Sequence, residues 1–353
     1  MRVLDRYIAR TVIGGSLMAL FIIVSLNVVF QFVDETGSVG QGSYSMLDAF
    51  AFTLLTTPQR AYEAWPIATL IGALVGLGGL AARHELVAMR AAGVSVFGVA
   101  RAVVIGGVVL ALVAAALGEW LAPQAERLAQ TLRSSAMDGQ VSSGLEGGFW
   151  VRDRGNYLHV SRAPSADVIE GVTIYEVHDG RLRAVIRAQR GQYEKGGWQL
   201  AGVHVTHVSR DGITEGAEPR RFIRSDLKPE MLGVVVVPPQ TLPLTDLATY
   251  IDYLQRNGLE SARYRLAFWE KLVTPLATVT MLLLTVPLVF GSLRSVGAGQ
   301  QMFVGVLIGI AFFLLNRLLG NAGIVYGLPP VVSALAPTAV FLALAVAGLA
   351  RTR

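Results

Sequence analysis

The chain has 353 residues, of which 53% are hydrophobic and only 16% are Asp, Glu, Lys or Arg. A soluble domain carries about 25% charged residues, so this composition excludes a single soluble globule, and its hydrophobicity excludes a disordered chain. The chain contains no cysteine, which excludes a disulfide framework, a thiolate metal site and a cysteine nucleophile. The net charge of +5 is read as membrane topology rather than nucleic-acid binding.

Six apolar runs approach the roughly 20 residues that a helix needs to cross a bilayer. In chain order they are 11–33, 65–82 with a helical lead-in from about residue 48, 97–121, 272–290, 302–319 and 331–350. A long polar stretch separates the third run from the fourth. The sequence therefore predicts a membrane α-helical protein with six transmembrane helices: three in 1–122, a polar domain with flanking helices in 123–265, and three in 266–353.

Positive charge is concentrated on one side of this predicted bundle. The opposite short loops, 34–47 and 320–330, contain no Lys or Arg. Because short cytoplasmic segments retain Lys and Arg, both termini are expected in the cytoplasm and the polar domain outside it. The positive side collects Arg2, Arg6, Arg10, Arg83, Arg90, Arg101, Arg294, Arg351 and Arg353.

Small residues and prolines occur within the apolar runs. Gly72 and Gly76 are four residues apart, as are Gly305 and Gly309, a spacing that lets helices approach closely in lipid. Ordinary helix packing is the favoured interpretation of this spacing. Four prolines are expected to bend their helices or to mark helix ends: Pro66, Pro275, Pro287 and Pro337.

The polar domain changes to a strand-like alternation from Gly148. Short strand-like segments lie at 149–151, 157–161, 171–177 and 198–200, with turn residues between them. This pattern predicts an all-β sandwich or jellyroll-like domain between Gly148 and Val237, followed by a helix over 244–257. Such a domain serves one of two roles. It either shields and orients the spans, or it binds an apolar ligand or a neighbouring strand on its inner faces or edges.

The sequence lacks the residues that several kinds of catalysis and metal binding require. None of Lys195, Lys228 and Lys271 ends a glycine-rich phosphate loop, so no ATPase site is expected in this chain. His204 and His207 are three apart on a predicted strand and point to opposite faces, so they form a poor metal pair. No nucleophile-elbow motif is present. The sequence predicts neither a catalytic residue nor a metal site.

Ionisable residues gather toward one end of the apolar runs, and the middle of each run is apolar. A proton- or ion-coupled carrier needs mid-membrane carboxylates, so that class is disfavoured. The pattern suggests a cavity that is apolar in depth and charged at its external rim, which suits an amphiphile with anionic head groups because Arg binds phosphate well. Snorkelling of Lys and Arg to the surface is the alternative. Arg317 fits snorkelling least, because Leu318, Leu319 and Gly320 separate it from its loop.

A short amphipathic segment, 83–93, connects the second and third runs. It is expected to form a helix along the inner membrane face, ended by Gly93. Leu86 and Met89 share an apolar face, while Glu85 and Arg90 supply charges. The segment is either an interfacial connector or a docking helix on which Glu85 meets a basic residue of a cytoplasmic motor.

A set of segments, in this order and spacing, resembles the lipopolysaccharide export permeases of the LptF/LptG family, and most closely its LptG members. The resemblance spans nearly the whole chain. The segments are Val3-Leu4-Asp5-Arg6-Tyr7-Ile8, Phe32-Val33-Asp34, Gly40-Gln41-Gly42-Ser43-Tyr44, Glu85-Leu86-Val87, Gly118-Glu119-Trp120-Leu121-Ala122-Pro123-Gln124, Leu232-Gly233-Val234-Val235, Val289-Phe290-Gly291-Ser292-Leu293-Arg294-Ser295 and Val325-Tyr326-Gly327-Leu328-Pro329-Pro330.

The resemblance implies a transmembrane permease subunit of an ABC transporter in the bacterial inner membrane, with its jellyroll in the periplasm. Such a subunit takes lipopolysaccharide from the periplasmic leaflet and passes it to a periplasmic bridge toward the outer membrane. The implied partners are a second, LptF-like permease, an LptB-like cytoplasmic ATPase dimer, a membrane-anchored LptC-like protein and an LptA-like bridge. ATP and Mg would act only through the ATPase; no cofactor in this chain and no nucleic acid are expected.

The resemblance also assigns candidate site residues. The connector corresponds to the family's coupling helix, with Arg83, His84, Glu85, Leu86, Met89 and Arg90 as ATPase-coupling residues. The residues that correspond to the rim of the family's cavity are expected to bind substrate. In this chain they are Asp34, Arg60, Arg127, Arg133, Arg265, Lys271 and Arg317. The alternative function is a non-transporting membrane scaffold or mechanotransmission subunit driven by a cytoplasmic ATPase.

Overall fold

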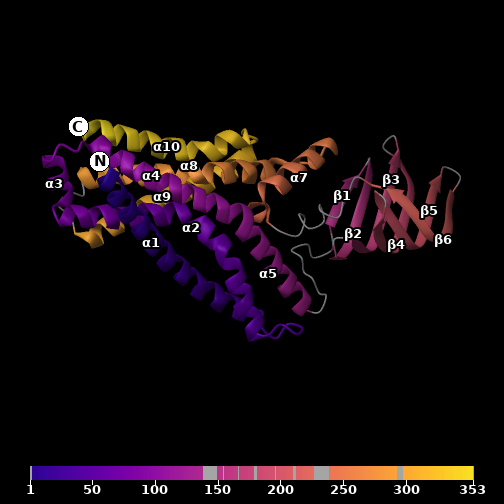
Figure 1. The fold of residues 1–353 in the computed structure, drawn as a ribbon. Coiled ribbons are helices and arrows are strands. Elements are labelled where there is room, and N and C mark those ends of the chain that lie inside the picture. The colour runs from indigo at the N-terminus through magenta and orange to yellow at the C-terminus, as the bar shows by residue number, and fades with distance from the viewer. Residues whose placement is uncertain are drawn as a thin grey trace. The chain divides into compact units, whose positions relative to one another are not determined.

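A computed structural model describes residues 2–137, 149–153, 155–165, 167–178, 181–194, 196–209, 212–225, 238–291 and 297–352. The chain divides into two units, shown in Figure 1: Met1–Val39, Ala49–Ala129 and Ala262–Arg353 form the first, and Gly40–Asp48 and Gln130–Ser261 form the second. Outside the described residues lie the segments 232–235 and 292–295, the second of which contains Arg294, and also Arg353, all used in the sequence predictions.

The first unit is helical. Its elements are α1 (Arg2–Thr36), α2 (Met46–Ala82), α3 (Glu85–Ala91), α4 (Val96–Ala116), the π-helix η1 (Leu117–Leu121), the beginning of α5 (Ala122–Ala136), α8 (Ala262–Phe290), α9 (Ala298–Tyr326) and α10 (Pro330–Arg351). Six helices of the described chain are long and apolar enough to span a membrane: α1, α2, the continuous α4–η1–α5, α8, α9 and α10. The prediction of six transmembrane helices is confirmed.

The helices extend well beyond the apolar runs. α9 continues to Tyr326, nine residues past Arg317 and about 14 Å along the axis at the helical rise. The prediction that Arg317 lies three residues from a loop is wrong. The helix continues because Gly320 packs against Leu266 and Gly323 packs against Ser333, so neighbouring helices stabilise a segment that is less apolar than the run before it.

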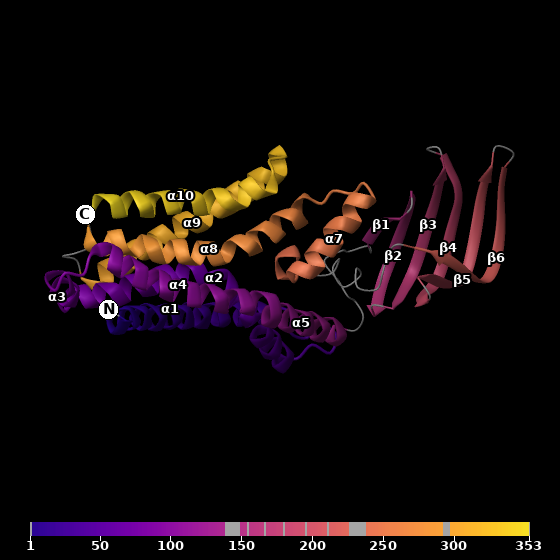
Figure 2. The same ribbon diagram turned by 45° about the horizontal axis from the view of Figure 1, so that its top comes forward.

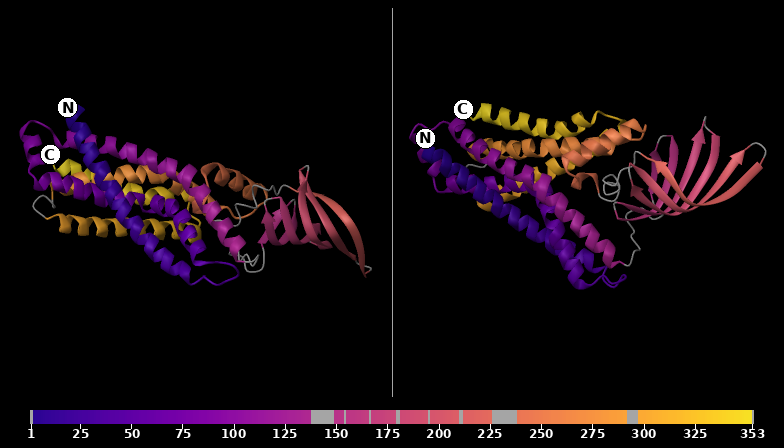
Figure 3. Two further views of the ribbon diagram at one scale, coloured as in Figure 1. Left: turned by 60° about the horizontal axis from the view of Figure 1, so that its bottom comes forward. Right: turned by 45° about the vertical axis from the view of Figure 1, so that its right-hand side comes forward.

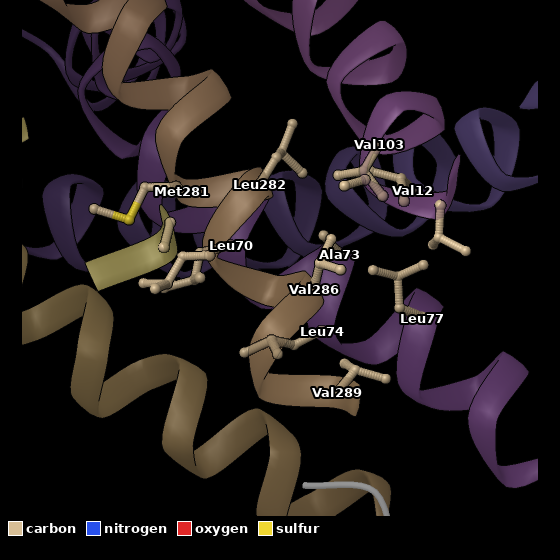
Figure 4. Close-up of a cluster of buried hydrophobic side chains, with 14 of the residues drawn as sticks. Val12, Leu70, Ala73, Leu74, Leu77, Val103, Met281, Leu282, Val286 and Val289 are labelled. Carbon is tan, nitrogen blue, oxygen red and sulfur yellow. The ribbon is translucent and has the colours of Figure 1, made fainter. Parts of the chain in front are cut away.

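A hydrophobic core joins α1, α2, α4 and α8, as Figure 4 shows. Val12, Leu74, Leu77, Val103 and Leu282 each have no exposed surface. In lipid this core gains stability from van der Waals packing more than from removal of surface from water.

Glycines mark the helix crossings. A Cβ atom on Gly15 of α1 would collide with the backbone of Gly72 in α2, so the two backbones touch. Gly305 and Gly309 of α9 pack against side chains of α2, including Leu74 and Ile67. The four-residue glycine spacings therefore serve helix packing, as the favoured interpretation expected.

The four singled-out prolines lie inside helices rather than at helix ends. Pro66 has no N–H to donate to the carbonyl oxygen of Tyr62 one turn earlier. The Thr69 hydroxyl donates to the Pro66 carbonyl oxygen at 2.8 Å, a local side-chain bond to the backbone next to this interruption.

The second unit contains a six-stranded antiparallel sheet in the order β1-β2-β3-β4-β5-β6, with the 3-10 helix η2 (Pro239–Thr241) and α7 (Leu244–Arg256) after it. The strands are Phe149–Asp153, Asn156–Ser165, Val168–His178, Arg181–Glu194, Gly197–Ser209 and Gly212–Arg224. The inserted β domain is confirmed, and its described strands form one sheet.

Directly paired residues define the two faces of this sheet. One row, Val151, Leu158, Ile174, Ile186 and Val205, runs across β1 to β5 and is buried. Because successive side chains of a strand alternate between faces, the residues between these positions occupy the opposite face of the sheet.

Both chain termini lie at the same end of the helical unit as α3, and the views in Figures 2 and 3 agree on this placement. An even number of spanning helices requires this arrangement. The connector and the two termini therefore share one side of any membrane that the six helices cross.

Candidate functional site

The predicted short connector helix forms as α3, between α2 and α4. His84, directly before it, adopts a left-handed conformation with φ of 61°, which His tolerates better than most side chains. At the other end the Val94 amide donates to the Met89 carbonyl oxygen, and the Gly93 amide donates to that of Arg90. With Gly93 at φ +88°, these bonds form a Schellman motif, so the predicted stop at Gly93 is confirmed.

The side chains of α3 divide into an anchoring face and an outer face. Leu86 is only 3% exposed and belongs to the hydrophobic core, and Met89 packs against that core. Arg83, His84 and Arg90 are exposed. The short helix is therefore fixed by its apolar face, while Arg83 and His84 before it and Arg90 in its last turn remain accessible.

Glu85 is held by a residue distant in sequence. The Tyr7 hydroxyl of α1 donates to Glu85 Oε2 at 2.7 Å. Beside it, Arg101 of α4 forms a 2.6 Å ion pair with Asp5 of α1. The first turns of α1 thus contact both ends of the α2–α3–α4 connection. Sequence reasoning missed Tyr7 because no local pattern indicates a contact across 78 residues.

The predicted rim residues are distributed over several helices. Asp34 is exposed near the end of α1; Arg127 and Arg317 are exposed on α5 and α9; Arg265 is half-buried on α8. Arg133 is half-buried on the part of α5 that belongs to the second unit.

Arg60 forms an exposed ion pair. Its Nη1 atom lies 3.4 Å from Oε2 of Glu63, and both side chains are about half exposed. Gln59 donates to the other carboxylate oxygen of Glu63 at 3.0 Å. Exposed pairs contribute little stability, so the Arg60 guanidinium is available to another anion at small cost.

Lys271 is the rim residue that the structure places inside a contact cluster. Its ammonium nitrogen lies 3.8 Å from Oε2 of Glu119, and its side chain is 6% exposed. The Tyr62 hydroxyl donates to the Lys271 carbonyl oxygen at 3.4 Å. A Cβ on Gly118 would lie 2.5 Å from the Tyr62 ring, so α2, η1 and α8 meet here.

Glu119 lies in η1, the π-helical segment between α4 and α5. A π-helical turn is rare and frequently accompanies a functional site. Glu119 belongs to one of the segments that carry the family resemblance but was not predicted as a site residue. A carboxylate within an apolar run was the available signal, whereas the backbone irregularity that directs it toward Lys271 was not predictable.

One further hydrogen bond and one buried donor without a partner lie among the described helices. Gln31 of α1 donates to the Thr56 hydroxyl of α2 at 2.6 Å. Arg265 has a buried Nε atom without a hydrogen-bond partner in the described structure. A buried guanidinium N–H is costly when unmet, so this donor is suited to an acceptor from outside the chain.

Six apolar helices with an inserted β domain define a multi-pass membrane protein. Comparison with known proteins makes the assignment specific. The profile of the family described as "Lipopolysaccharide export system permease LptF/LptG" matches residues 6–351. The chain belongs to this family, and with it to the inner-membrane proteins of Gram-negative bacteria.

Individual relatives agree with the family match. The chain is 36% identical to the lipopolysaccharide export system permease protein LptG of Escherichia coli K12 over 343 residues, which cover 96% of this chain and 95% of the relative. It is 33% identical to the LptG protein of Haemophilus influenzae over 342 residues, covering 96% of each. Both matches extend over the spans and the inserted domain, as the sequence resemblance implied.

Proposed function

We propose that this chain is the transmembrane subunit of an ABC transporter that extracts lipopolysaccharide from the periplasmic leaflet of the inner membrane and passes it toward the outer membrane. The observation that carries the proposal is the family match over residues 6–351, which includes every spanning helix. The partners are a second, LptF-like permease, an LptB-like ATPase dimer that hydrolyses ATP, an LptC-like protein and an LptA-like bridge.

The proposed orientation puts α3 and both termini in the cytoplasm and the β domain in the periplasm. The arginines near α3 and the termini support it, because the loops at the other helix ends lack Lys and Arg. In this orientation α3 faces the ATPase.

Glu85 is the proposed ATPase contact. Leu86 fixes α3 to the core, so a force applied to Glu85 moves α2 and α4 rather than only a loose connector. Rigid elements with well-packed side chains transmit such displacements. The helices then narrow the cavity that the two permeases enclose.

The cavity is proposed to hold acyl chains along its apolar walls and phosphates at its basic rim. Moving an acyl chain out of an apolar environment costs about 0.8 kcal/mol per CH₂ group. Several chains together therefore require tens of kcal/mol (an order of magnitude from the same coefficient), which explains why extraction needs both ATP and an apolar receiver such as the β domain.

The proposal is tested by reconstitution of the complex with its cognate permease and ATPase in proteoliposomes that contain lipopolysaccharide. The expected result is ATP-dependent release of lipopolysaccharide to added soluble bridge protein, with loss of release in Glu85→Ala while the complex still assembles. ATP hydrolysis and movement of the β domain without lipid release would instead support the scaffold or mechanotransmission function.

A further inference from the structure

The solvent face of the β sheet carries a row of aromatic and basic residues. The register pairs Trp150 with His159, His159 with Thr173, Thr173 with Arg187 and Arg187 with His204. Directly paired residues of antiparallel strands lie on the same face, about 5 Å apart. The row therefore extends across five strands, β1 to β5, on the face opposite the buried row.

The aromatic part of this face lies on β1, β2 and β3. Trp150 is 62% exposed, yet its ring stacks on Tyr175 with centroids 5.6 Å apart and contacts His159 at 4.9 Å. Tyr157, directly paired with Tyr175, is 42% exposed. A continuous exposed aromatic surface of this kind is typical of binding sites rather than of scattered surface residues.

The basic part lies beside it on β4 and β5. Arg187 and His204 are directly opposite each other and both exposed. The row from Trp150 to His204 contains no carboxylate. The neighbouring row on the same face begins with Tyr157 and Tyr175 and ends with Thr206 and Glu215, so its acidic residue lies on the edge strand β6. An anion between Arg187 and His204 would thus meet donors and no nearby carboxylate within these two rows.

The combination favours a phosphorylated saccharide. A sugar ring offers an apolar face of C–H groups to an aromatic ring, and its hydroxyl and phosphate groups accept from Arg, His and Thr. Arg187 carries a planar guanidinium whose donors match the oxygens of a phosphate, and His204 lies directly opposite it on β5. This charge complementarity, next to exposed aromatic rings, favours an anionic sugar as the occupant.

We propose that the face formed by Trp150, Tyr157, His159, Tyr175, Arg187 and His204 binds the phosphorylated saccharide part of the transported glycolipid. This inference rests on the proposed function for the identity of the cargo. It assigns the solvent face of the sheet to the sugars, so that the domain guides the head group as well as any acyl chains.

The test measures saccharide binding by the full-length chain in nanodiscs. Saturation-transfer NMR, with irradiation of protein aromatic protons, follows titration with the delipidated oligosaccharide of lipopolysaccharide, either phosphorylated or phosphatase-treated. We expect saturable transfer to sugar-ring protons. Trp150→Ala weakens binding of both forms about tenfold, whereas Trp150→Phe, which keeps a ring, stays within about threefold of the unsubstituted chain.

Arg187→Gln separates the phosphate contribution. It is expected to weaken binding of the phosphorylated form about tenfold and to leave binding of the phosphatase-treated form unchanged. Phe222→Ala and Arg181→Gln are the controls, since both residues are exposed on the sheet and lie outside the two rows; binding by both is expected to be unaltered.

Absence of saturable binding, or equal binding by Trp150→Ala, would overturn the inference. Protection of Trp150 by another protein of the assembled complex, together with absence of saccharide binding, would identify a protein interface instead. Release of lipopolysaccharide by the reconstituted complex is measured separately. Binding without release would contradict the proposed function, and release without binding would contradict this inference alone.

Discussion

Lys271 and Glu119 illustrate how a membrane-spanning helix retains a buried charge. Their 3.8 Å separation is longer than the 2.7–2.9 Å typical of a charge-assisted hydrogen bond. The pair is therefore held by charge attraction in an apolar surrounding rather than by a tight bond. Glu119 is 24% exposed, so the carboxylate side of the pair is open to water.

Removal of only one partner should be costly. Glu119→Gln removes the carboxylate charge that lies 3.8 Å from a buried ammonium, which is expected to lower the free energy of unfolding by up to about 3–5 kcal/mol. Adding Lys271→Met should restore most of that loss, because an apolar replacement needs no partner. Thermal and denaturant unfolding in detergent measure both changes.

Arg60→Gln is the matched control for that pair. Its ion pair with Glu63 is about half exposed, so the expected loss is below about 1 kcal/mol. Equal losses for Arg60→Gln and Glu119→Gln would contradict the distinction between a buried and an exposed pair.

The hydrogen bond between Tyr7 and Glu85 predicts a role for α1 in coupling. Tyr7→Phe removes only the donor of the 2.7 Å bond, so we expect normal assembly and stability but fewer lipopolysaccharide molecules released per ATP hydrolysed. Measurement of release and hydrolysis in one proteoliposome sample gives this ratio.

Tyr326→Phe serves as the control for Tyr7, because Tyr326 is 78% exposed at the end of α9. An unchanged ratio in Tyr7→Phe, with Glu85→Ala defective, would show that Glu85 acts without α1. A loss of assembly in Tyr7→Phe would indicate a purely structural bond.

At the scale of elements, Gly15 and Gly72 let the backbones of α1 and α2 touch where the two helices cross. Gly14 has open space around its Cβ position, whereas a Cβ on Gly15 would overlap the Gly72 backbone. Gly14→Ala should therefore stabilise the helix by up to about 1 kcal/mol through helix propensity. Gly15→Ala should destabilise the protein by about 1–3 kcal/mol through overpacking.

Unfolding midpoints of these neighbouring variants provide the comparison. The two substitutions add the same methyl group to the same helix, so propensity cancels between them. If Gly15→Ala were as stable as Gly14→Ala, the close approach of α1 and α2 would not exist in the membrane.

The elements differ in how far sequence could predict them. The six spans follow from long apolar runs, and the end of α3 follows from Gly93, because both signals are local. The extension of α9 to Tyr326 depends on packing of Gly320 and Gly323 against other helices. Such contacts are not encoded in any local pattern, which is why the helix end was misplaced.

The candidate site shows the same limit. The structure confirms that the connector contains one short helix with a shared apolar face for Leu86 and Met89. Tyr7 and Glu119 were not selected, because their relevance depends on long-range contacts and on a π-helical turn. Alternation and turn residues indicated segments within β1, β2, β3 and β5 but not β4 or β6, and the full strand lengths depend on pairing across the sheet.

At the scale of the whole molecule, the orientation across the membrane makes a direct prediction. Because the chain has no cysteine, single cysteines can be labelled without background. Ile213→Cys on β6 is expected to react with a membrane-impermeant maleimide on spheroplasts, whereas Arg90→Cys on α3 reacts only after permeabilisation. Both positions are exposed, so access depends on the side of the membrane; the reverse pattern would contradict the proposed topology.

The proposed transport route joins these scales. In this proposed route, Glu85 on α3 contacts the ATPase and moves with it. The packed helices transmit the displacement, and the rim arginines hold phosphates above apolar walls. Arg60 and Arg317 lie well inside α2 and α9, so neither is explained simply as a residue at a helix end.

The most direct measurement is photocrosslinking of lipopolysaccharide in the assembled complex from Arg60, Arg133 and Arg317, each replaced in turn by a photoreactive residue. Leu112, exposed on α4, is the control position outside the predicted rim. The account predicts lipid adducts at the rim positions that diminish when ATP drives release. Adducts at Leu112 or elsewhere, with none at any of the three arginine positions, would contradict it.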